Sequence, residues 1–132
     1  MSFTHKVLLV DDDEIANLLH SKTLKKYDFC DQIYTALNGM DALEGLDTYL
    51  PNILFLDLKM PKMDGFDFLA EFEKLPEDLT SKISVFILTS SISQVDYQKV
   101  NQFKIKGFLN KPLSKDKLEE VKKRIWGPSI IL

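Results

Sequence analysis

Carboxylates stand directly after two short apolar runs of the sequence. Asp11 and Asp12 follow one run, and Asp57 follows another. Carboxylates held about 4 Å apart repel one another by roughly 4 kcal/mol per pair at an effective dielectric constant near 20, and a single lysine such as Lys111 cannot offset that cost for three. A hard divalent cation can, and Mg²⁺ combines one or two carboxylates with waters and a phosphoryl group. If the three residues meet in the fold, they predict a Mg²⁺ site and a phosphoryl ligand.

A phosphoryl group at such a site would meet a nucleophile and groups that stabilise charge. Asp57 is the expected nucleophile, because a carboxylate can attack phosphorus and carry the group as an acyl phosphate. The metal and Lys111 would neutralise the charge that develops on the transferred oxygens. Thr89, which follows a further apolar run, would donate its hydroxyl to one of those oxygens. Together these residues predict a phosphoryl-transfer site.

The elements that must position these residues alternate between strands and helices. Short apolar runs that end at polar residues predict buried strands, and apolar residues at helical spacing predict helices that each turn one apolar face to the sheet. The expected strands are residues 7–10, 33–37, 53–56, 85–88 and 108–109; the expected helices carry Ile15, Leu18 and Leu19, then Met40, Leu43 and Leu50, then Leu69, Phe72 and Leu75, then Val95, Lys99 and Gln102, and last Leu118, Val121 and Ile125. The pattern predicts five strands and five helices.

Repeated strand, helix, strand units predict an α/β fold. Their crossovers are almost always right-handed, which gives a doubly wound, five-stranded parallel sheet with helices on both faces. Ligands bind beyond the carboxyl ends of the strands in such a sheet, where Asp11, Asp57, Thr89 and Lys111 are expected. The flavodoxin-like strand order 2-1-3-4-5 would place these strand ends side by side.

The length of 132 residues indicates one domain. We expect it to span residues 1–132, with a core at about 6–126, a short tail at 127–132 and no output domain. The net charge of −3 predicts no direct binding to nucleic acid or to an anionic membrane. No apolar run approaches the roughly 20 residues of a membrane span, and no signal peptide is visible, so the expected location is cytoplasmic. Cys30 is expected to be a small, mostly buried apolar residue.

Four motifs occur in a fixed order along the chain. They are VLLVDDDE at Val7–Glu14, LFLDLKMPKMDGFDFL at Leu54–Leu69, ILTSS at Ile87–Ser91 and GFLNKPL at Gly107–Leu113. Each is weak alone, but in this order they closely resemble the receiver domain of two-component response regulators, of the single-domain type. The resemblance extends over about residues 6–126. It implies a phosphoacceptor that labels itself from a phosphodonor and loses the group slowly, rather than an enzyme with turnover of external substrates.

The resemblance implies a role for each residue of the expected site. Asp57 would accept a phosphoryl group from a phosphohistidine of a sensor histidine kinase or a phosphotransfer protein. Asp11 and Asp12 would form the acidic pocket for Mg²⁺, together with Asp57 and the backbone carbonyl of Lys59. Lys111 matches the lysine of the family motif.

A conformational switch is implied as well. Thr89 matches the switch hydroxyl and Phe108 the aromatic switch position, so phosphorylation would draw Thr89 inward and Phe108 would follow. The face built by the fourth predicted helix, the fifth strand and the last helix would then change for an unknown downstream protein. A homodimer is left open.

The loops around the site carry further expectations. In the family the bond Lys111–Pro112 is usually cis, and Pro112 and Gly65 are expected to have structural roles. Lys59 and Ser91 occupy positions that vary in the family and tune dephosphorylation.

Several charged residues also have simple structural interpretations. Asp13 and Glu14 are expected only to cap the first helix and complement its dipole. His5 and His20 are expected to be partly exposed polar residues. The basic residues of the last helix are expected to form a solvated face, with the docking of an acidic partner as the alternative; they are Lys115, Lys117, Lys122, Lys123 and Arg124.

Two other functions compete with the phosphoacceptor. A Mg²⁺-dependent phosphohydrolase with an aspartyl intermediate, as in haloacid-dehalogenase-like enzymes, uses a second acid two residues after the nucleophile, where this chain has Lys59. A flavodoxin-like nucleotide or flavin module needs a phosphate-binding loop of Ser, Thr and Gly after the first strand, where this chain has four consecutive acids. Both alternatives are therefore ranked below the phosphoacceptor.

Overall fold

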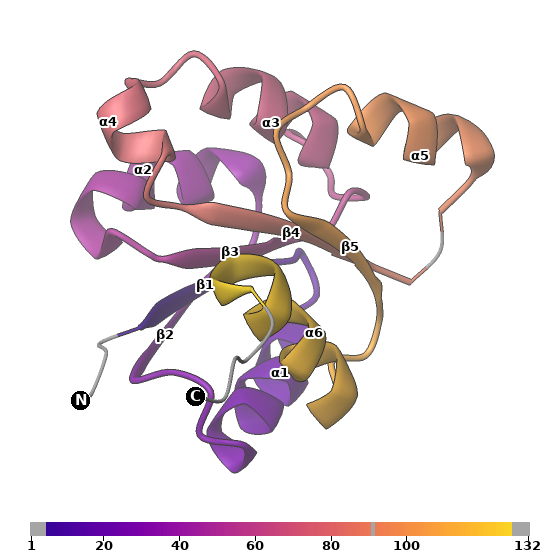
Figure 1. Cartoon of the computed structure of the whole chain (residues 1–132). Coiled ribbons are helices and arrows are strands. Elements are labelled where there is room, and N and C mark those ends of the chain that lie inside the picture. Colours follow the sequence, from indigo (N-terminus) through magenta and orange to yellow (C-terminus); the bar gives the residue numbers. More distant parts are fainter. Residues whose placement is uncertain (1–4, 91, 128–132) are drawn as a thin grey trace.

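The structure is a computed structural model that describes residues 5–90 and 92–127. Strands and helices alternate along these residues (Figure 1). The elements are β1 (Lys6–Val10), α1 (Glu14–Lys26), β2 (Gln32–Ala36), α2 (Gly39–Tyr49), β3 (Ile53–Leu56), α3 (Gly65–Phe72), α4 (Glu77–Thr80), β4 (Ser84–Thr89), α5 (Gln94–Val100), β5 (Gly107–Asn110) and α6 (Lys115–Trp126). Ser91 and all of the predicted tail beyond Gly127 lie outside the described residues.

The five strands form one parallel sheet in the order β2-β1-β3-β4-β5, which confirms the predicted topology. Val10, the last residue of β1, pairs with Leu56, the last residue of β3. At the other side of the sheet, Thr89 of β4 pairs with Asn110 of β5. Leu56 pairs with Ile87, so β4 and β5 extend two residues beyond the ends of β1 and β3. All four carboxyl ends lie at the same edge of the sheet, as the expected site requires.

Helices cover both faces of this sheet, with α1 and α6 on one side and α2, α3, α4 and α5 on the other (Figure 1). Successive side chains of a strand point to opposite faces. Leu8 of β1 joins the core beneath α2 and α3, whereas Leu9 joins the core beneath α1 and α6. The inner strands β1, β3 and β4 are buried on both faces because they are apolar at nearly every position, whereas the edge strand β2 is partly exposed.

One short helix, α4, adds to the five predicted helices. It spans four residues after Pro76, buries none of them, and has no side-chain hydrogen bond at its N-cap. A single turn of this kind has no apolar periodicity to reveal it in the sequence. No helix among residues 5–90 and 92–127 has both the length and the hydropathy of a bilayer-crossing segment.

The predicted inward face of α1 is wrong. Ile15, Leu18 and Leu19 are 67%, 55% and 55% exposed, and the helix instead turns Asn17 and His20 inward. These two polar residues share a helix face with Leu24, which packs in the core beneath α1 and α6. The expectation that His20 is partly exposed is therefore also wrong.

Two residues assigned to the apolar face of α2 are exposed as well. Met40 lies in its first turn, and Leu50 forms its C-cap in the left-handed conformation. Ala42 and Leu46 provide the buried face instead. Cys30 is half-buried against the core beneath α1 and α6, and burial raises the pKa of its thiol to about 11.

Candidate functional site

The ends of the two central strands place Asp11 and Asp57 side by side. The backbone N–H of Asp57 donates to the carbonyl of Val10 (3.0 Å), and the N–H of Asp11 donates to the carbonyl of Ala36 (3.1 Å). Parallel pairing thus continues one residue beyond β1 and β3. Both aspartates are buried, which is unusual for carboxylates without partners.

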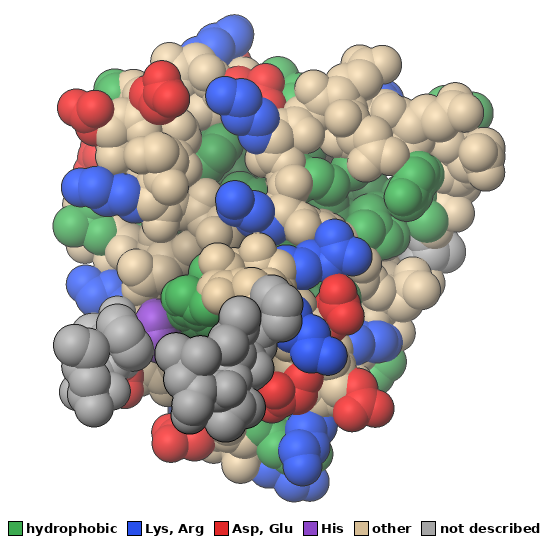
Figure 2. Space-filling model, in the orientation of Figure 1, with side chains coloured by type: hydrophobic (Ala, Val, Ile, Leu, Met, Phe, Trp, Pro, Cys, Tyr) green, Lys and Arg blue, Asp and Glu red, His purple; other side chains and the backbone are tan. Residues whose placement is uncertain are grey.

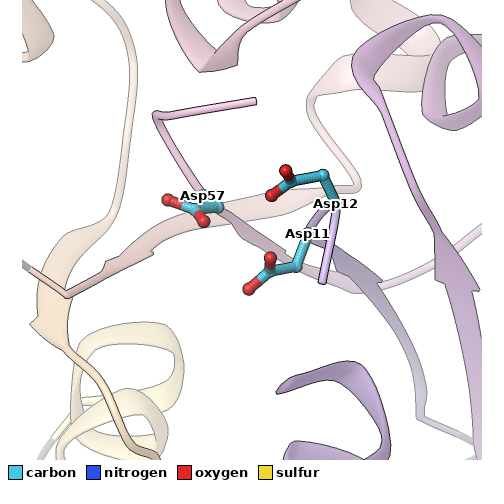
Figure 3. A group of neighbouring side chains, drawn as sticks. All are labelled: Asp11, Asp12 and Asp57. Carbon is cyan, nitrogen blue, oxygen red and sulfur yellow. The ribbon is translucent and has the colours of Figure 1, made fainter. Parts of the chain in front are cut away.

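A cluster of three carboxylates forms at this edge of the sheet. One carboxylate oxygen each from Asp11, Asp12 and Asp57 lies within 4.8 Å of the other two. The side chains point into one small region beyond the ends of β1 and β3 (Figure 3). Asp12 is exposed, so the cluster opens to solvent on one side. Oxygen donors in this arrangement fit a hard divalent cation such as Mg²⁺, which keeps several waters.

Two groups from the neighbouring strands converge on Asp57. The hydroxyl of Thr89 donates to Oδ1 of Asp57 (3.1 Å), and the ammonium of Lys111 donates to Oδ2 (3.0 Å). The same ammonium forms an ion pair with Asp11. The backbone of Lys111 is fixed to β4, since its N–H donates to the carbonyl of Thr89 (2.8 Å). Both oxygens of one carboxylate therefore have a side-chain donor.

Burial and charge act against each other in this group. Burial raises the pKa of Asp11, although hydrogen bonds from Lys111 and from the backbone of Asp13 oppose the rise. Burial also disfavours the charged form of Lys111, but its hydrogen bonds to Asp11 and Asp57 and their negative charge outweigh this, so the pKa of Lys111 is raised. Lys111 therefore remains a cation between the two carboxylates.

Loop backbone supports the carboxylates further. The N–H of Asp13 donates to Asp11 (2.9 Å), and the N–H of Lys59 donates to Asp57 (3.3 Å). The side chain of Asp13 also accepts from the N–H of Ile15, so Asp13 caps α1 as expected. A Cβ atom at Gly65 would lie 2.7 Å from the carbonyl oxygen of Asp57, so only glycine allows this close approach.

Asn17 and His20 were not predicted at the site, yet they line a small cavity beneath Asp11 and Asp57. The amide of Asn17 donates to the carbonyl of Asp11 (3.0 Å). Burial lowers the pKa of His20, and the positive charge of Lys111 lowers it further. The sequence signal that could have revealed them is their spacing. Asn17 and His20 are three residues apart, and Leu24 follows four residues later, so the three share one face of the helix and that face ends in an apolar residue.

The other predicted residues take varied places. Lys59 is exposed, and its carbonyl stays a predicted metal ligand. Thr89 already reaches Asp57 in the unmodified chain. Phe108 is half-buried, with its ring centroid 5.8 Å from that of Tyr97. The bond between Lys111 and Pro112 is cis, as the resemblance implies.

The basic residues of α6 are only in part a solvated face. Lys122 and Arg124 pair with Glu119 and Glu120 one turn away, and Figure 2 shows positive and negative side chains side by side over this helix. Lys117 does not follow the expectation, because its ammonium donates to backbone carbonyls of the loop before α6.

Comparisons with known proteins agree with this geometry. The response regulator receiver domain model matches residues 7–123. Protein PilG of Pseudomonas aeruginosa is 33% identical over 113 residues, which cover 86% of this chain and 81% of the relative. The "Probable chemotaxis protein CheY" of Rhizobium etli is 30% identical over 122 residues and 92% of each chain.

Solved structures agree on the fold. A two-component response regulator from Cytophaga hutchinsonii has a TM-score of 0.86 at 23% identity, over 96% of this chain and 100% of that chain. The bacteriophytochrome response regulator AtBRR has a TM-score of 0.80 at 25% identity, over 99% of both chains. With the strand order, the acidic cluster and the family match in agreement, the chain belongs to the response regulator receiver domain family.

Proposed function

We propose that this chain accepts a phosphoryl group on Asp57 from a phosphohistidine, in a reaction that depends on Mg²⁺, and passes the signal on by contact. One observation carries the proposal: Thr89 and Lys111 donate to different oxygens of the same buried carboxylate. A cap or a surface acid would not need two such donors. The arrangement instead suits a carboxylate that will gain further negative oxygens.

The chemistry follows from these contacts. A carboxylate oxygen of Asp57 forms a bond to phosphorus while the bond from phosphorus to the imidazole nitrogen breaks, and the electron pair stays on that nitrogen. Lys111 offers its charge, and Thr89 its hydroxyl, to the transferred oxygens. Asp11, Asp12 and Asp57 would hold Mg²⁺, with the carbonyl of Lys59 as a further ligand. The metal would neutralise charge on the phosphoryl group.

The exposed face of α1 supports a protein as the phosphodonor. Ile15, Leu18 and Leu19 place apolar surface on the helix that begins beside Asp11. Apolar side chains that gather at one exposed face mark an interaction site. We propose that a sensor histidine kinase or a phosphotransfer protein docks there and presents its phosphohistidine to Asp57. A relative named Sensor histidine kinase CheAY, from Helicobacter pylori, is 28% identical over 120 residues, which make up 14% of its length.

The output surface is proposed on α5, β5 and α6. Hydrophobic side chains gather between α5 and β5 (Figure 2), where Val95 and Tyr97 are exposed and Tyr97 contacts Phe108. Phosphorylation would strengthen the pull of the phosphoryl group on Thr89. Phe108 would follow, since it lies on the neighbouring strand opposite Ile87, two residues before Thr89. Such a switch needs only a few kcal/mol of differential stabilisation.

Turnover of external substrates is not part of the proposal. An aspartyl-phosphate phosphohydrolase would need an acid where Lys59 stands, and a flavin or nucleotide module would need a phosphate loop where Asp11, Asp12 and Asp13 stand. We propose self-labelling from a small phosphodonor and slow loss of the group instead. The cytoplasmic location and the single-domain organisation stay predictions.

Mass spectrometry of the intact chain tests the proposal. With acetyl phosphate and Mg²⁺ we expect one added phosphoryl group, and none after Mg²⁺ is chelated. Asp57→Asn should abolish the label, whereas Asp47→Asn, on the exposed side of α2, should leave it unchanged. A fully labelled Asp57→Asn protein would refute the assignment, and steady multiple turnover of phosphate esters would favour the phosphohydrolase.

A further inference from the structure

The first turn of α6 has a lysine where helices favour an acid. The side chain of Ser114 accepts from the N–H of Lys117 (3.3 Å), which makes Lys117 the third residue of the helix. A glutamate or glutamine there would complete a capping box, and α3 has Asp67 at its equivalent position. The positive charge of Lys117 opposes the helix dipole. A lysine at this unfavourable position is expected to make another contact that compensates for the cost.

The compensating contact is to the end of β5 and the loop that follows it. The ammonium of Lys117 donates to the carbonyl of Asn110 (2.6 Å) and to the carbonyl of Pro112 (2.9 Å). These two residues flank Lys111 on either side. Hydrogen bonds from a charged donor are shorter and about twice as strong as neutral ones. One side chain therefore fixes the backbone before and after the lysine of the site.

The backbone of Lys111 is then held from two directions. Its own N–H donates to the carbonyl of Thr89 on β4 (2.8 Å), and the carbonyls next to it are held by α6. The Lys111 ammonium must meet Asp11 and Asp57 at the same time. A long, flexible side chain meets two partners only when its backbone is fixed, and functional groups tolerate about 0.5 Å of error.

We propose that Lys117 is a positioning residue for Lys111: it clamps the loop from Asn110 to Pro112 and thereby sets the rate at which Asp57 is phosphorylated. The inference rests on the proposed function of Asp57. Lys117 acts through the backbone, because its ammonium donates to the carbonyls of Asn110 and Pro112.

Lys117→Met tests the clamp, since it removes the ammonium and keeps the length of the side chain. Lys115→Met is the matched control, because Lys115 is an exposed lysine in the same helical turn and loses the same charge. We expect Lys117→Met to slow labelling by acetyl phosphate about tenfold, short of the roughly 100-fold loss that a 1 Å misplacement can cause. Lys115→Met should label at the wild-type rate.

Amide hydrogen exchange separates positioning from general support of α6. In Lys117→Met the amide of Lys111, which donates to Thr89, should exchange faster, while the amides of Leu118 and Val121 keep their protection. Lys117→Arg retains charged donors and should restore both the label and the protection of Lys111. If Lys117→Met fails to fold, Lys117→Gln takes its place, since its shorter amide cannot reach both carbonyls.

Three outcomes overturn the inference: labelling of Lys117→Met at the rate of Lys115→Met, unchanged exchange at Lys111, or an equal loss of protection throughout α6. The exchange measurement uses no phosphodonor, so it tests the clamp even if Asp57 is not the acceptor. If the wild-type chain is not phosphorylated by acetyl phosphate, the proposed function is wrong instead.

Discussion

The two helices on one face of the sheet, α1 and α6, bury opposite kinds of side chain. α6 turns Leu118 and Val121 into the core, as an amphipathic helix should. α1 buries Asn17 and His20 along with Leu24, and leaves its large apolar residues Ile15, Leu18 and Leu19 exposed. Both helices cover the same face of the sheet, but α1 lies nearest the inner strand β1 and α6 lies nearest β5 at its edge.

The difference comes from what each helix supports. α1 begins directly after the acidic loop formed by Asp11, Asp12 and Asp13. Its buried polar face lies beneath that loop: Asn17 donates to the carbonyl of Asp11, and His20 lines the cavity under Asp57. α6 is anchored by its apolar face, and only its first turn reaches the site, through Lys117. Packing therefore dominates α6, whereas α1 gives up apolar burial to hold the site and to expose a surface.

The largest expected effect is in the core of α6. Leu118→Ala removes a side chain that is 2% exposed, and we expect it to lower the free energy of unfolding by about 2–5 kcal/mol. Urea unfolding followed by circular dichroism measures this change. A loss below about 0.5 kcal/mol would contradict the packing role of α6, because that is the range of surface substitutions rather than of cavities.

A smaller loss is expected at the polar face of α1. Asn17→Ala leaves the carbonyl of Asp11 without its side-chain donor, at a cost of about 1–3 kcal/mol. The buried Oδ1 of Asn17 has no partner among the described residues, so its removal recovers part of that cost and places the effect near the lower limit. Asn101→Ala, at the exposed C-cap of α5, is the control and should change stability little. Equal stability of the two variants would mean that Asn17 does not support the loop.

The same comparison shows what the sequence could predict. Asp11, Asp57 and Lys111 each follow a strand and Thr89 ends one. Parallel strands end at one edge of the sheet, so the meeting of these residues follows from topology alone. The buried face of α1 could not be predicted in this way. Ile15 and the two leucines after it have the spacing of a core face, and periodicity alone cannot distinguish a buried apolar face from an exposed one. Side-chain burial there depends on where the acidic loop passes.

The role of Lys117 shows a second limit. Its place at the third residue of α6 could be read from Ser114 as N-cap, but its acceptors are backbone carbonyls that only the path of the loop brings within reach. Every residue has the same backbone carbonyl, so the type of the accepting residue does not reveal such a contact. The single turn of α4 could not be predicted either, because it buries no side chain and so has no apolar periodicity.

His20 should give a modest dependence of stability on pH. Its pKa is lowered by burial and by Lys111 and Lys117, against the charge of Asp57. The folded chain thus keeps His20 neutral, while the unfolded chain takes up a proton below the ordinary value of 6.5. Because the unfolded state then binds more protons, the contribution of His20 to stability falls as pH falls.

His20→Gln isolates this contribution. Urea unfolding at about pH 7.5 and about pH 5.5 should show a smaller acid loss in His20→Gln than in the wild-type chain. Asp11, whose raised pKa acts in the opposite direction, is present in both proteins and cancels in the comparison. Equal losses in the two proteins would show that His20 takes up its proton equally well in the folded chain.

The smallest effect on stability is expected on the exposed face of α1, where the matched partner of Leu118→Ala is Leu18→Ala. Leu18 is 55% exposed, so its truncation should change the free energy of unfolding by no more than about 0.5 kcal/mol.

Labelling of Leu18→Ala by acetyl phosphate should be unchanged, because the small donor needs only Asp57 and its neighbours. Transfer from a phosphorylated histidine kinase or phosphotransfer protein should slow, since that donor must dock. If Leu18→Ala accepts the group from a protein donor as fast as the wild-type chain does, the exposed leucine has no part in docking. The exposure of the apolar residues of α1 would then follow only from the support that its buried polar face gives to the acidic loop.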